Sequence, residues 1–201
     1  MACRVAINGY GRIGQSVLRA FYEKRAAGGA NEIQIVSINE LSDIETVAYL
    51  TRYDTTHGRF PQRVEVASEN HLRVADDLIS FTRCDSLEQL PWRAEEIDLV
   101  LECTGVYKKR VEADKHILAG GKRVLLSQPA DTGVDKTIVY GFNHLKLSSE
   151  DKVVSNASCT TNAIVPVIRA LDDAFEIKLG SLTTIHSAMN DQPTIDAYHH
   201  H

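Results

Sequence analysis

The chain begins with a short strand, a glycine cluster and a helix, and this order limits its possible folds more than any other feature. Residues Cys3–Asn8 form a β-branched apolar run that is typical of a buried strand. After the glycines, apolar residues recur at helical spacing, namely Ile13, Val17, Leu18 and Phe21. Beyond the breaker Gly28–Gly29, Ile33–Asn39 predicts a second buried strand. The segment between the strands has the length of a βαβ crossover, so we expect parallel pairing and a right-handed connection.

Strand and helix patterns continue to alternate along the chain. Strands are predicted in Ile97–Gly105, Lys122–Ser127 and Thr137–Gly141, with a helix over Arg110–Ala119. Three short strand-like runs within Arg63–Thr82 predict a small antiparallel excursion from the main sheet. The alternation predicts an α/β fold with a Rossmann-type, doubly wound and mostly parallel sheet.

Composition argues against several other classes of protein. Of the 201 residues, 43% are hydrophobic and 24% are charged, which is typical of a folded globular protein. The net charge of -5 argues against a nucleic-acid partner. Because no apolar run has the length of a membrane span and no signal-peptide pattern precedes the first strand, we expect no membrane contact. The four cysteines are widely spaced, which predicts neither disulfides nor a metal site and favours a cytoplasmic protein.

The string N-G-Y-G-R-I-G predicts a phosphate-binding loop. In it, Gly9, Gly11 and Gly14 have the G-x-G-x-x-G spacing between a strand and a helix. The first glycine allows the turn, the second lets a pyrophosphate approach the backbone, and the third lets the helix pack on the strand. The amides of Arg12 and Ile13 at the helix N-terminus would bind the anion. A glycine-rich turn without a ligand is the alternative, and the surrounding strand and helix argue against it.

The end of the second strand predicts which dinucleotide binds. Asn39 and Glu40 follow that strand, where a carboxylate can accept hydrogen bonds from ribose hydroxyls and would repel a 2′-phosphate. NAD is therefore favoured over NADP. In the alternative interpretation, Glu40 is a solvated loop acid.

The string S-N-A-S-C-T-T-N predicts a reactive cysteine at the start of a helix. Cys159 precedes I-V-P-V-I-R-A-L, whose apolar spacing fits a buried helix with Pro166 inside it. Ser158 or Asn156 can cap this helix, and its positive end favours thiolate over thiol at Cys159. The β-branched run Leu182–Ile185 predicts a strand that ends at His186, which would serve as the base for this nucleophile.

The other cysteines and histidines receive structural interpretations. Cys103 closes an apolar strand and is expected to be a small buried hydrophobe, and Cys3 and Cys84 are interpreted in the same way. His57 and His116 are expected to be structural. The closing run His199–His201 is interpreted as a tag or a cut end rather than a metal site.

Five strings, in order along the chain, resemble the glyceraldehyde-3-phosphate dehydrogenase family. They are N-G-Y-G-R-I-G, Y-D-T-T-H-G-R-F, E-C-T-G-V-Y, S-N-A-S-C-T-T-N and T-T-I-H-S-A-M-N-D-Q. Within the family the chain looks closest to the erythrose-4-phosphate dehydrogenase branch, because of I-N-E-L at Ile38–Leu41, L-P-W at Leu90–Trp92 and H-S-A-M at His186–Met189. The resemblance implies NAD as cofactor, a sugar-phosphate substrate and a homotetramer when the protein is full length.

The resemblance also implies roles for individual residues. Cys159 would attack the aldehyde, and His186 would activate the thiol and assist hydride departure. Substrate-binding positions are matched by Ser158, Thr160 and Asp191. Positions that line the NAD groove are matched by Arg12, Ile13, Glu40, Thr104, Gly105 and Ser127.

The resemblance divides the chain into a Rossmann domain, residues 1–157, and the start of a truncated α+β catalytic domain, residues 158–201. The family's catalytic domain continues beyond His201, so we expect the 201-residue chain alone to have little turnover.

Two departures from the family pattern bear on the chemistry. A second cysteine is frequent four residues after the nucleophile, and here that residue is Ala163. Glyceraldehyde-3-phosphate enzymes usually carry a threonine where this chain has Met189, and a thioether is a poor phosphate ligand. We therefore expect oxidation of erythrose 4-phosphate to 4-phosphoerythronate through a cysteine thioester that water hydrolyses. The alternatives are a phosphorylating glyceraldehyde-3-phosphate dehydrogenase and, from another class, a non-catalytic NAD-binding module.

Overall fold

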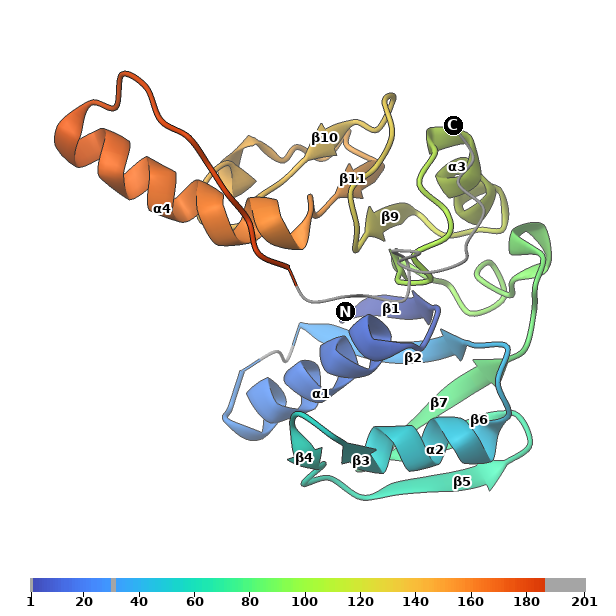
Figure 1. Ribbon diagram of the computed structural model, residues 1–201. Coiled ribbons are helices and arrows are strands. Elements are labelled where there is room, and N and C mark those ends of the chain that lie inside the picture. Colours follow the sequence, from blue (N-terminus) through green and yellow to red (C-terminus); the bar gives the residue numbers. More distant parts are fainter. Residues whose placement is uncertain (1, 30–31, 187–201) are drawn as a thin grey trace, which may run out of the picture.

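The computed structural model describes residues 2–29 and 32–186 (Figure 1). Its elements in chain order are β1 (Cys3–Asn8), α1 (Arg12–Ala26), β2 (Ile33–Asn39), α2 (Ile44–Arg52), β3 (Tyr53–Asp54), β4 (Gly58–Arg59), β5 (Val64–Ser68), β6 (His71–Val74), β7 (Asp77–Thr82), η1 (Leu87–Gln89), β8 (Leu99–Glu102), α3 (Arg110–Leu118), β9 (Arg123–Leu126), β10 (Lys136–Thr137), η2 (His144–Lys146), β11 (Val153–Ser155) and α4 (Cys159–Phe175).

Nine of these strands form one sheet in the order β10-β11-β9-β8-β1-β2-β7-β6-β5. Neighbours from β10 to β7 pair in parallel, and the antiparallel pairs β7–β6 and β6–β5 lie at one edge. β1 lies between β2 and β8, so the strand order reverses at β1. The predicted Rossmann-type, mostly parallel α/β fold is confirmed, and β1 and β2 have the predicted bounds.

Alternating side chains of the central strands support a separate core on each face of the sheet. On one face, Ile7 and Ile38 pack with Leu18 of α1 and Val47 of α2. Figure 1 shows these two helices on the same side of β1 and β2. On the other face, the second core includes residues of β1, β2, η1, α3 and β9, among them Ala6, Val36, Leu87, Ala113 and Val124. Helices on both faces make the sheet doubly wound.

The antiparallel strands within Arg63–Thr82 are present, but they do not leave the main sheet. β7 pairs in parallel with β2, with Ser37 opposite Ser80 and Asn39 opposite Thr82. The hairpin strands β5 and β6 then extend the same sheet by antiparallel pairing. The prediction that these strands form a unit outside the main sheet was therefore wrong. The unpaired edge of β2 offers backbone hydrogen bonds, and β7 pairs with it.

The sequence patterns did not predict four short elements, α2, β3, β4 and β11. α2 begins after Asp43, whose carboxylate accepts the amide of Thr46 at 2.9 Å and so caps the helix. β3 and β4 form a two-stranded ladder of only two residues each. β11 lies near the end of the predicted Rossmann domain, and it pairs with β9 and β10 inside the sheet.

The segment after β11 differs most from expectation. α4 includes Pro166 as predicted, but none of its residues is buried, so the prediction of a buried helix was wrong. Val167, Leu171 and Phe175 are exposed because no described residue packs on them. The predicted strand Leu182–Ile185 is absent from the described structure, which offers that segment no neighbouring strand with which to pair. Among the described helices, none combines the length and the apolar character that a membrane crossing requires.

Two glycines of the loop after β1 are required by close packing. Gly9 has a φ of 84°, and a Cβ there would lie 2.6 Å from the Thr104 amide nitrogen. A Cβ on Gly14 would lie 2.4 Å from the carbonyl oxygen of Gly9. Gly14 therefore lets α1 pack directly against the turn that ends β1.

Replacing Gly14 by alanine should lower the free energy of unfolding by about 1–3 kcal/mol, because the added methyl group overpacks this contact. Urea denaturation followed by circular dichroism measures the change. Gly180→Ala is the matched control, since no atom lies within 4 Å of a Cβ at that position, and it should change stability by less than about 0.5 kcal/mol. Equal effects of the two substitutions would contradict this account of the loop.

Candidate functional site

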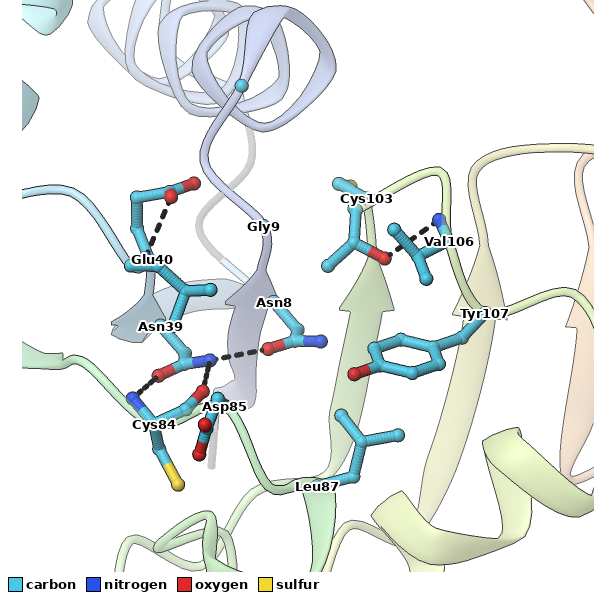
Figure 2. A pocket seen from close by; sticks show the side chains of 13 residues that line it. Asn8, Gly9, Asn39, Glu40, Cys84, Asp85, Leu87, Cys103, Val106 and Tyr107 are labelled. Atoms are coloured by element: carbon cyan, nitrogen blue, oxygen red, sulfur yellow. Dashed lines mark hydrogen bonds between the residues drawn. The ribbon is translucent and has the colours of Figure 1, made fainter. Parts of the chain in front are cut away.

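A cavity of about 270 Å³ opens at the carboxyl ends of β1, β2 and β8. Its lining residues are Asn8, Gly9, Gly11, Asn39, Glu40, Leu41, Cys84, Asp85, Leu87, Cys103, Thr104, Val106 and Tyr107. Figure 2 shows Glu40 on the β2 side and Tyr107 on the β8 side of this cavity. Ligands of open parallel sheets bind where the strand order reverses, and here that place is β1.

The N-terminus of α1 faces this cavity with unpaired amides. Gly11 is the N-cap residue and provides no side-chain hydrogen bond, and the first turn contains no acidic residue. The amides of the first turn have no partner within the helix, and the helix dipole makes this end positive. No atom lies within 4 Å of a Cβ built on Gly11, so a ligand can approach the backbone there. The loop has the geometry of a pyrophosphate site.

Glu40 is held by the backbone at the cavity rim. Its Oε2 accepts the amide of Tyr10 at 2.7 Å, and its Oε1 accepts the amides of Leu41 at 2.7 Å and Ser42 at 3.3 Å. This carboxylate is thus fixed beside the glycine loop rather than free in solvent, contrary to the interpretation of a solvated loop acid. It offers an acceptor for hydroxyl groups and a negative charge that opposes a phosphate.

The guanidinium of Arg12 is directed away from the first cavity. It forms an ion pair with Asp54 and donates to the hydroxyl of Thr56 at 3.3 Å. Hydrogen bonding from the His57 amide, together with the Arg12 guanidinium, lowers the pKa of Asp54 to about 2. Arg12 therefore joins α1 to β3 and the turn after it. Its side chain lines none of the three cavities described in this section.

A second cavity of about 370 Å³ connects the glycine loop region to the predicted nucleophile. It is lined by Ile13, Val17, Leu101, Cys103, Leu125, Ser127, Asn156, Ala157, Cys159 and Asn162. Cys103 lines both cavities, and α1 reaches each of them, through Gly11 in the first and Ile13 in the second. Ile13, which was expected to line the cofactor groove, is 51% exposed and lines this second cavity.

The start of α4 positions Cys159. Ser158 is the N-cap residue, and its hydroxyl oxygen accepts the amide of Thr161 at 2.9 Å. The amide side chain of Asn162 donates to the carbonyl oxygens of Asn156 at 2.7 Å and Ser158 at 3.0 Å, which fixes the turn before the helix. Cys159 is thereby the first residue of the helix, beside its positive end.

Cys159 and His186 come together although the predicted strand before His186 is absent. The Sγ of Cys159 lies 3.2 Å from the Nε2 of His186. This hydrogen bond holds the pKa of the Cys159 thiol below its ordinary value, and the amide and hydroxyl of Thr160 lower it further. The sulfur also borders a third cavity, about 440 Å³, between α4 and the segment Leu182–His186. Cys159 thus separates a cavity on the sheet side from one on the histidine side.

The other thiol in this region has the opposite character. Cys103 is buried, and this burial raises the pKa of its thiol to about 12, an effect that a hydrogen bond with Ser127 only partly offsets. A thiol with so high a pKa is unreactive at neutral pH. Ser127 itself lines the second cavity.

Several predicted residues have other places. Gly105 has a φ of 77° and lines none of the three cavities. Ser158 is occupied in capping α4, whereas Thr160 lines the third cavity. Asp191 and Met189 lie outside the described residues, as does the run His199–His201.

Sequence reasoning missed part of the cavity wall. Asn8, Asp85 and Tyr107 line the first cavity, and Asn156 and Asn162 line the second. Asn8 ends β1, so the rule that ligands bind at the carboxyl ends of parallel strands could have identified it. The other four lie after the ends of strands or in the first turn of a helix, and no sequence pattern predicts that residues there line a cavity.

The fold and this groove define a dinucleotide-dependent oxidoreductase. Residues 3–110 match the NAD-binding domain of glyceraldehyde 3-phosphate dehydrogenase, and residues 158–201 match the C-terminal domain of that enzyme family. The chain belongs to the glyceraldehyde 3-phosphate dehydrogenase family, whose domains make it an NAD-dependent dehydrogenase of phosphorylated aldehydes.

The residues present fit NAD. The open space at Gly11 and the unpaired amides of α1 suit the pyrophosphate, and the carboxylate of Glu40 suits ribose hydroxyls. The largely apolar second cavity, which contains Cys159, suits a nicotinamide ring.

The contrast between the two thiols predicts selective alkylation. Iodoacetamide near pH 7 should modify Cys159 well before Cys103, because only the thiolate reacts and only Cys159 has a lowered pKa. In His186→Ala, the pH at which Cys159 is half-maximally reactive should rise toward that of an ordinary thiol. Peptide mass spectrometry over a pH series measures both. A Cys159 no more reactive than Cys103 in the unsubstituted chain would contradict the site and support a non-catalytic module.

The position of Glu40 predicts the choice of cofactor. Glu40→Ala should weaken NAD binding and reduce the preference for NAD over NADP by about tenfold, since it removes a hydroxyl acceptor and a charge that opposes the 2′-phosphate. Isothermal titration calorimetry with each cofactor measures the ratio. Glu69→Ala is the control, because it removes the same charge from the exposed turn between β5 and β6. An unchanged ratio in Glu40→Ala would show that discrimination lies elsewhere.

Proposed function

We propose that this chain carries the NAD site and the nucleophile of an enzyme that oxidises erythrose 4-phosphate to 4-phosphoerythronate through a thioester on Cys159. The observation that carries the thioester chemistry is the 3.2 Å separation between the Cys159 sulfur and His186 Nε2, at the boundary of two cavities. A nucleophile with an adjacent base beside a dinucleotide groove suits the oxidation of an aldehyde.

In the first step the thiolate of Cys159 adds to the aldehyde carbon, and His186, which has taken the thiol proton, gives that proton to the carbonyl oxygen to form a hemithioacetal. His186 then takes the hydroxyl proton as hydride leaves the carbon, and the carbon–oxygen double bond of the thioester forms. Bound NAD accepts this hydride. The amide of Cys159, in the first turn of α4, is a candidate donor to the oxyanion.

The two cavities that border the Cys159 sulfur suit different ligands. The second cavity lies on the sheet side of Cys159 and continues to the glycine loop through Cys103, so it suits the cofactor ring. The third cavity contains Thr160 and His186 and suits the aldehyde. Thr160 can then contact the substrate while its amide and hydroxyl stabilise the thiolate.

In the second step, water attacks the thioester, the carbon–sulfur bond breaks, and the acid leaves with regeneration of the Cys159 thiolate. Water is favoured over inorganic phosphate because Met189 occupies a position where a threonine hydroxyl is usual, and a thioether is a poor phosphate ligand. Of the three strings that favour the erythrose 4-phosphate branch, L-P-W contributes Leu90 and Trp92 to the core and no group to the site. The substrate proposal depends on I-N-E-L and H-S-A-M.

A phosphorylating glyceraldehyde-3-phosphate dehydrogenase is the second candidate. It uses the same nucleophile and base and differs in the substrate and in the acceptor of the acyl group. Both candidates require formation of the acyl enzyme, so this intermediate distinguishes them from a module that only binds NAD.

Acylation of Cys159 tests the proposal without requiring full turnover. With NAD present, erythrose 4-phosphate should add one acyl group to the chain, and each acyl group formed should produce one NADH. The adduct should be lost in water without added phosphate. Intact-mass spectrometry and absorbance measure these changes, and Cys159→Ser, which lacks the thiolate, is the control. Acylation by glyceraldehyde 3-phosphate alone, with release only when phosphate is added, would favour the second candidate.

A further inference from the structure

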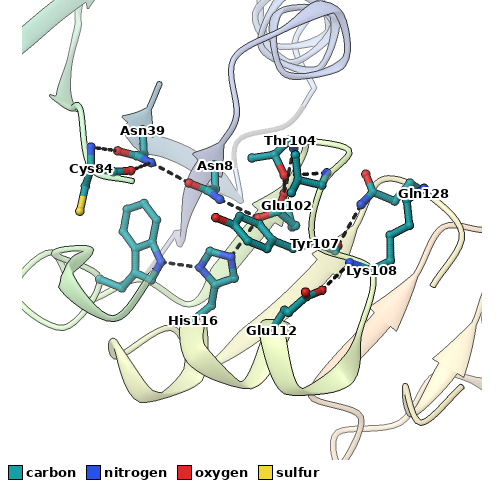
Figure 3. Close-up of polar contacts among 12 residues, drawn as sticks. Asn8, Asn39, Cys84, Glu102, Thr104, Tyr107, Lys108, Glu112, His116 and Gln128 are labelled. Atoms are coloured by element: carbon teal, nitrogen blue, oxygen red, sulfur yellow. Dashed lines mark hydrogen bonds and ion pairs between the residues drawn. The ribbon is translucent and has the colours of Figure 1, made fainter. Parts of the chain in front are cut away.

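A buried carboxylate lies behind the wall of the cofactor groove. Glu102 ends β8, its side chain is fully buried, and it does not line any of the three cavities described above. Figure 3 shows it at the centre of a polar network that links Asn39, Asn8 and His116. Asn8, Asn39 and His116 are themselves at most 5% exposed. So many polar groups are rarely buried together unless each has a partner.

Hydrogen bonds from the core side are directed toward Glu102. The indole N–H of Trp92 can only donate, and it donates to Nδ1 of His116 at 3.0 Å. Nδ1 is therefore an acceptor without a proton, and the proton of the neutral imidazole is on Nε2. That nitrogen lies 3.0 Å from Oε2 of Glu102 and donates to it.

Hydrogen bonds from the β2 side have the same direction. The backbone amide of Cys84 donates to Oδ1 of Asn39 at 2.8 Å, which fixes the orientation of this side-chain amide. The Asn39 side chain then donates to Oδ1 of Asn8 at 2.8 Å, and the Asn8 side chain donates to Oε2 of Glu102 at 2.6 Å. The two ends of the network are thus donors that cannot reverse.

The second oxygen of Glu102 is bonded to the cavity wall. Oε1 accepts the backbone amide of Thr104 at 2.8 Å and also accepts the Thr104 hydroxyl. Each oxygen of Glu102 therefore accepts hydrogen bonds from two donors, so four hydrogen bonds fix the position of this side chain.

Thr104 connects this network to the glycine loop. It lines the first cavity, and its backbone lies so close to Gly9 that a Cβ on Gly9 would be 2.6 Å from the Thr104 nitrogen. A displacement of Thr104 would change the cavity wall and the packing of the turn that presents the α1 amides.

We propose that Glu102 is a positioning residue for the NAD site. Its carboxyl group holds Thr104 against the glycine loop and orients Asn8, which lines the same cavity, without touching the cofactor itself. This inference rests on NAD as the cofactor and is independent of which aldehyde the enzyme oxidises.

The substitution Glu102→Gln tests the proposal. Glutamine has nearly the same shape, but one of its two acceptor oxygens becomes an NH₂ group that faces donors which cannot reverse. We expect the dissociation constant for NAD to increase by about tenfold or more, because mismatched buried donors displace Thr104 and Asn8. Isothermal titration calorimetry on the folded 201-residue chain measures the change, with circular dichroism to establish the folded fraction.

Two controls separate positioning from loss of stability or charge. Trp92→Phe removes a buried donor that lines none of the three cavities and should destabilise the fold, but Glu102 keeps its bonds to Thr104 and Asn8. Glu88→Gln makes the same chemical change at an exposed carboxylate that pairs with Lys115. Both variants should bind NAD within about twofold of the unsubstituted chain.

The outcomes are distinct. Unchanged NAD affinity in Glu102→Gln, or an equal loss in Trp92→Phe, would overturn the proposal.

If Glu102→Gln does not fold, His116→Phe replaces it, because it removes one donor from the same carboxylate and leaves the cavity residues intact. About threefold weaker NAD binding is then expected, and unchanged binding would overturn the proposal. If the unsubstituted chain fails to bind NAD, the cofactor assignment fails, and this inference fails with it.

Discussion

Parallel pairing of β1 with β2 and β8 is the constraint on which the site depends. It brings the carboxyl ends of three strands to one edge of the sheet, so that Asn8, Asn39 and Glu102 meet although they are far apart in the sequence. The same pairing directs the glycine turn, and with it the N-terminus of α1, across this edge. The helices on both faces cover the apolar surfaces that such a sheet leaves exposed.

Two helix N-termini serve different purposes along one groove. The first turn of α1 presents unpaired amides where glycine leaves space for a phosphate group. The first turn of α4 holds Cys159, whose thiolate is stabilised by His186 and by Thr160. Between them, Cys103 is a buried thiol with a raised pKa that borders both cavities. The positive ends of two helices thus favour an anionic ligand in one place and an anionic nucleophile in the other.

The sequence predicted the elements that have a strong local signal. The bounds of β1 and β2, the glycine turn and the helix after it follow from apolar periodicity and from glycine spacing. Features that depend on packing could not be predicted in this way: the apolar spacing of α4 predicted a buried helix, and none of its residues is buried. The proximity of Cys159 and His186 was expected from their chemistry, whereas the strand expected to deliver His186 is absent from the described structure. The network around Glu102 has no local pattern, because its members come from six separate segments of the chain.

A crystal structure of the chain with bound NAD shows whether the nicotinamide ring lies beside the Cys159 sulfur. We expect the pyrophosphate on the amides at the start of α1, and the nicotinamide ring among Ile13, Ser127 and Cys159, with the sulfur facing the ring. A ring bound elsewhere, with the Cys159 sulfur directed away from the groove, would show that this thiol does not act on a substrate beside NAD.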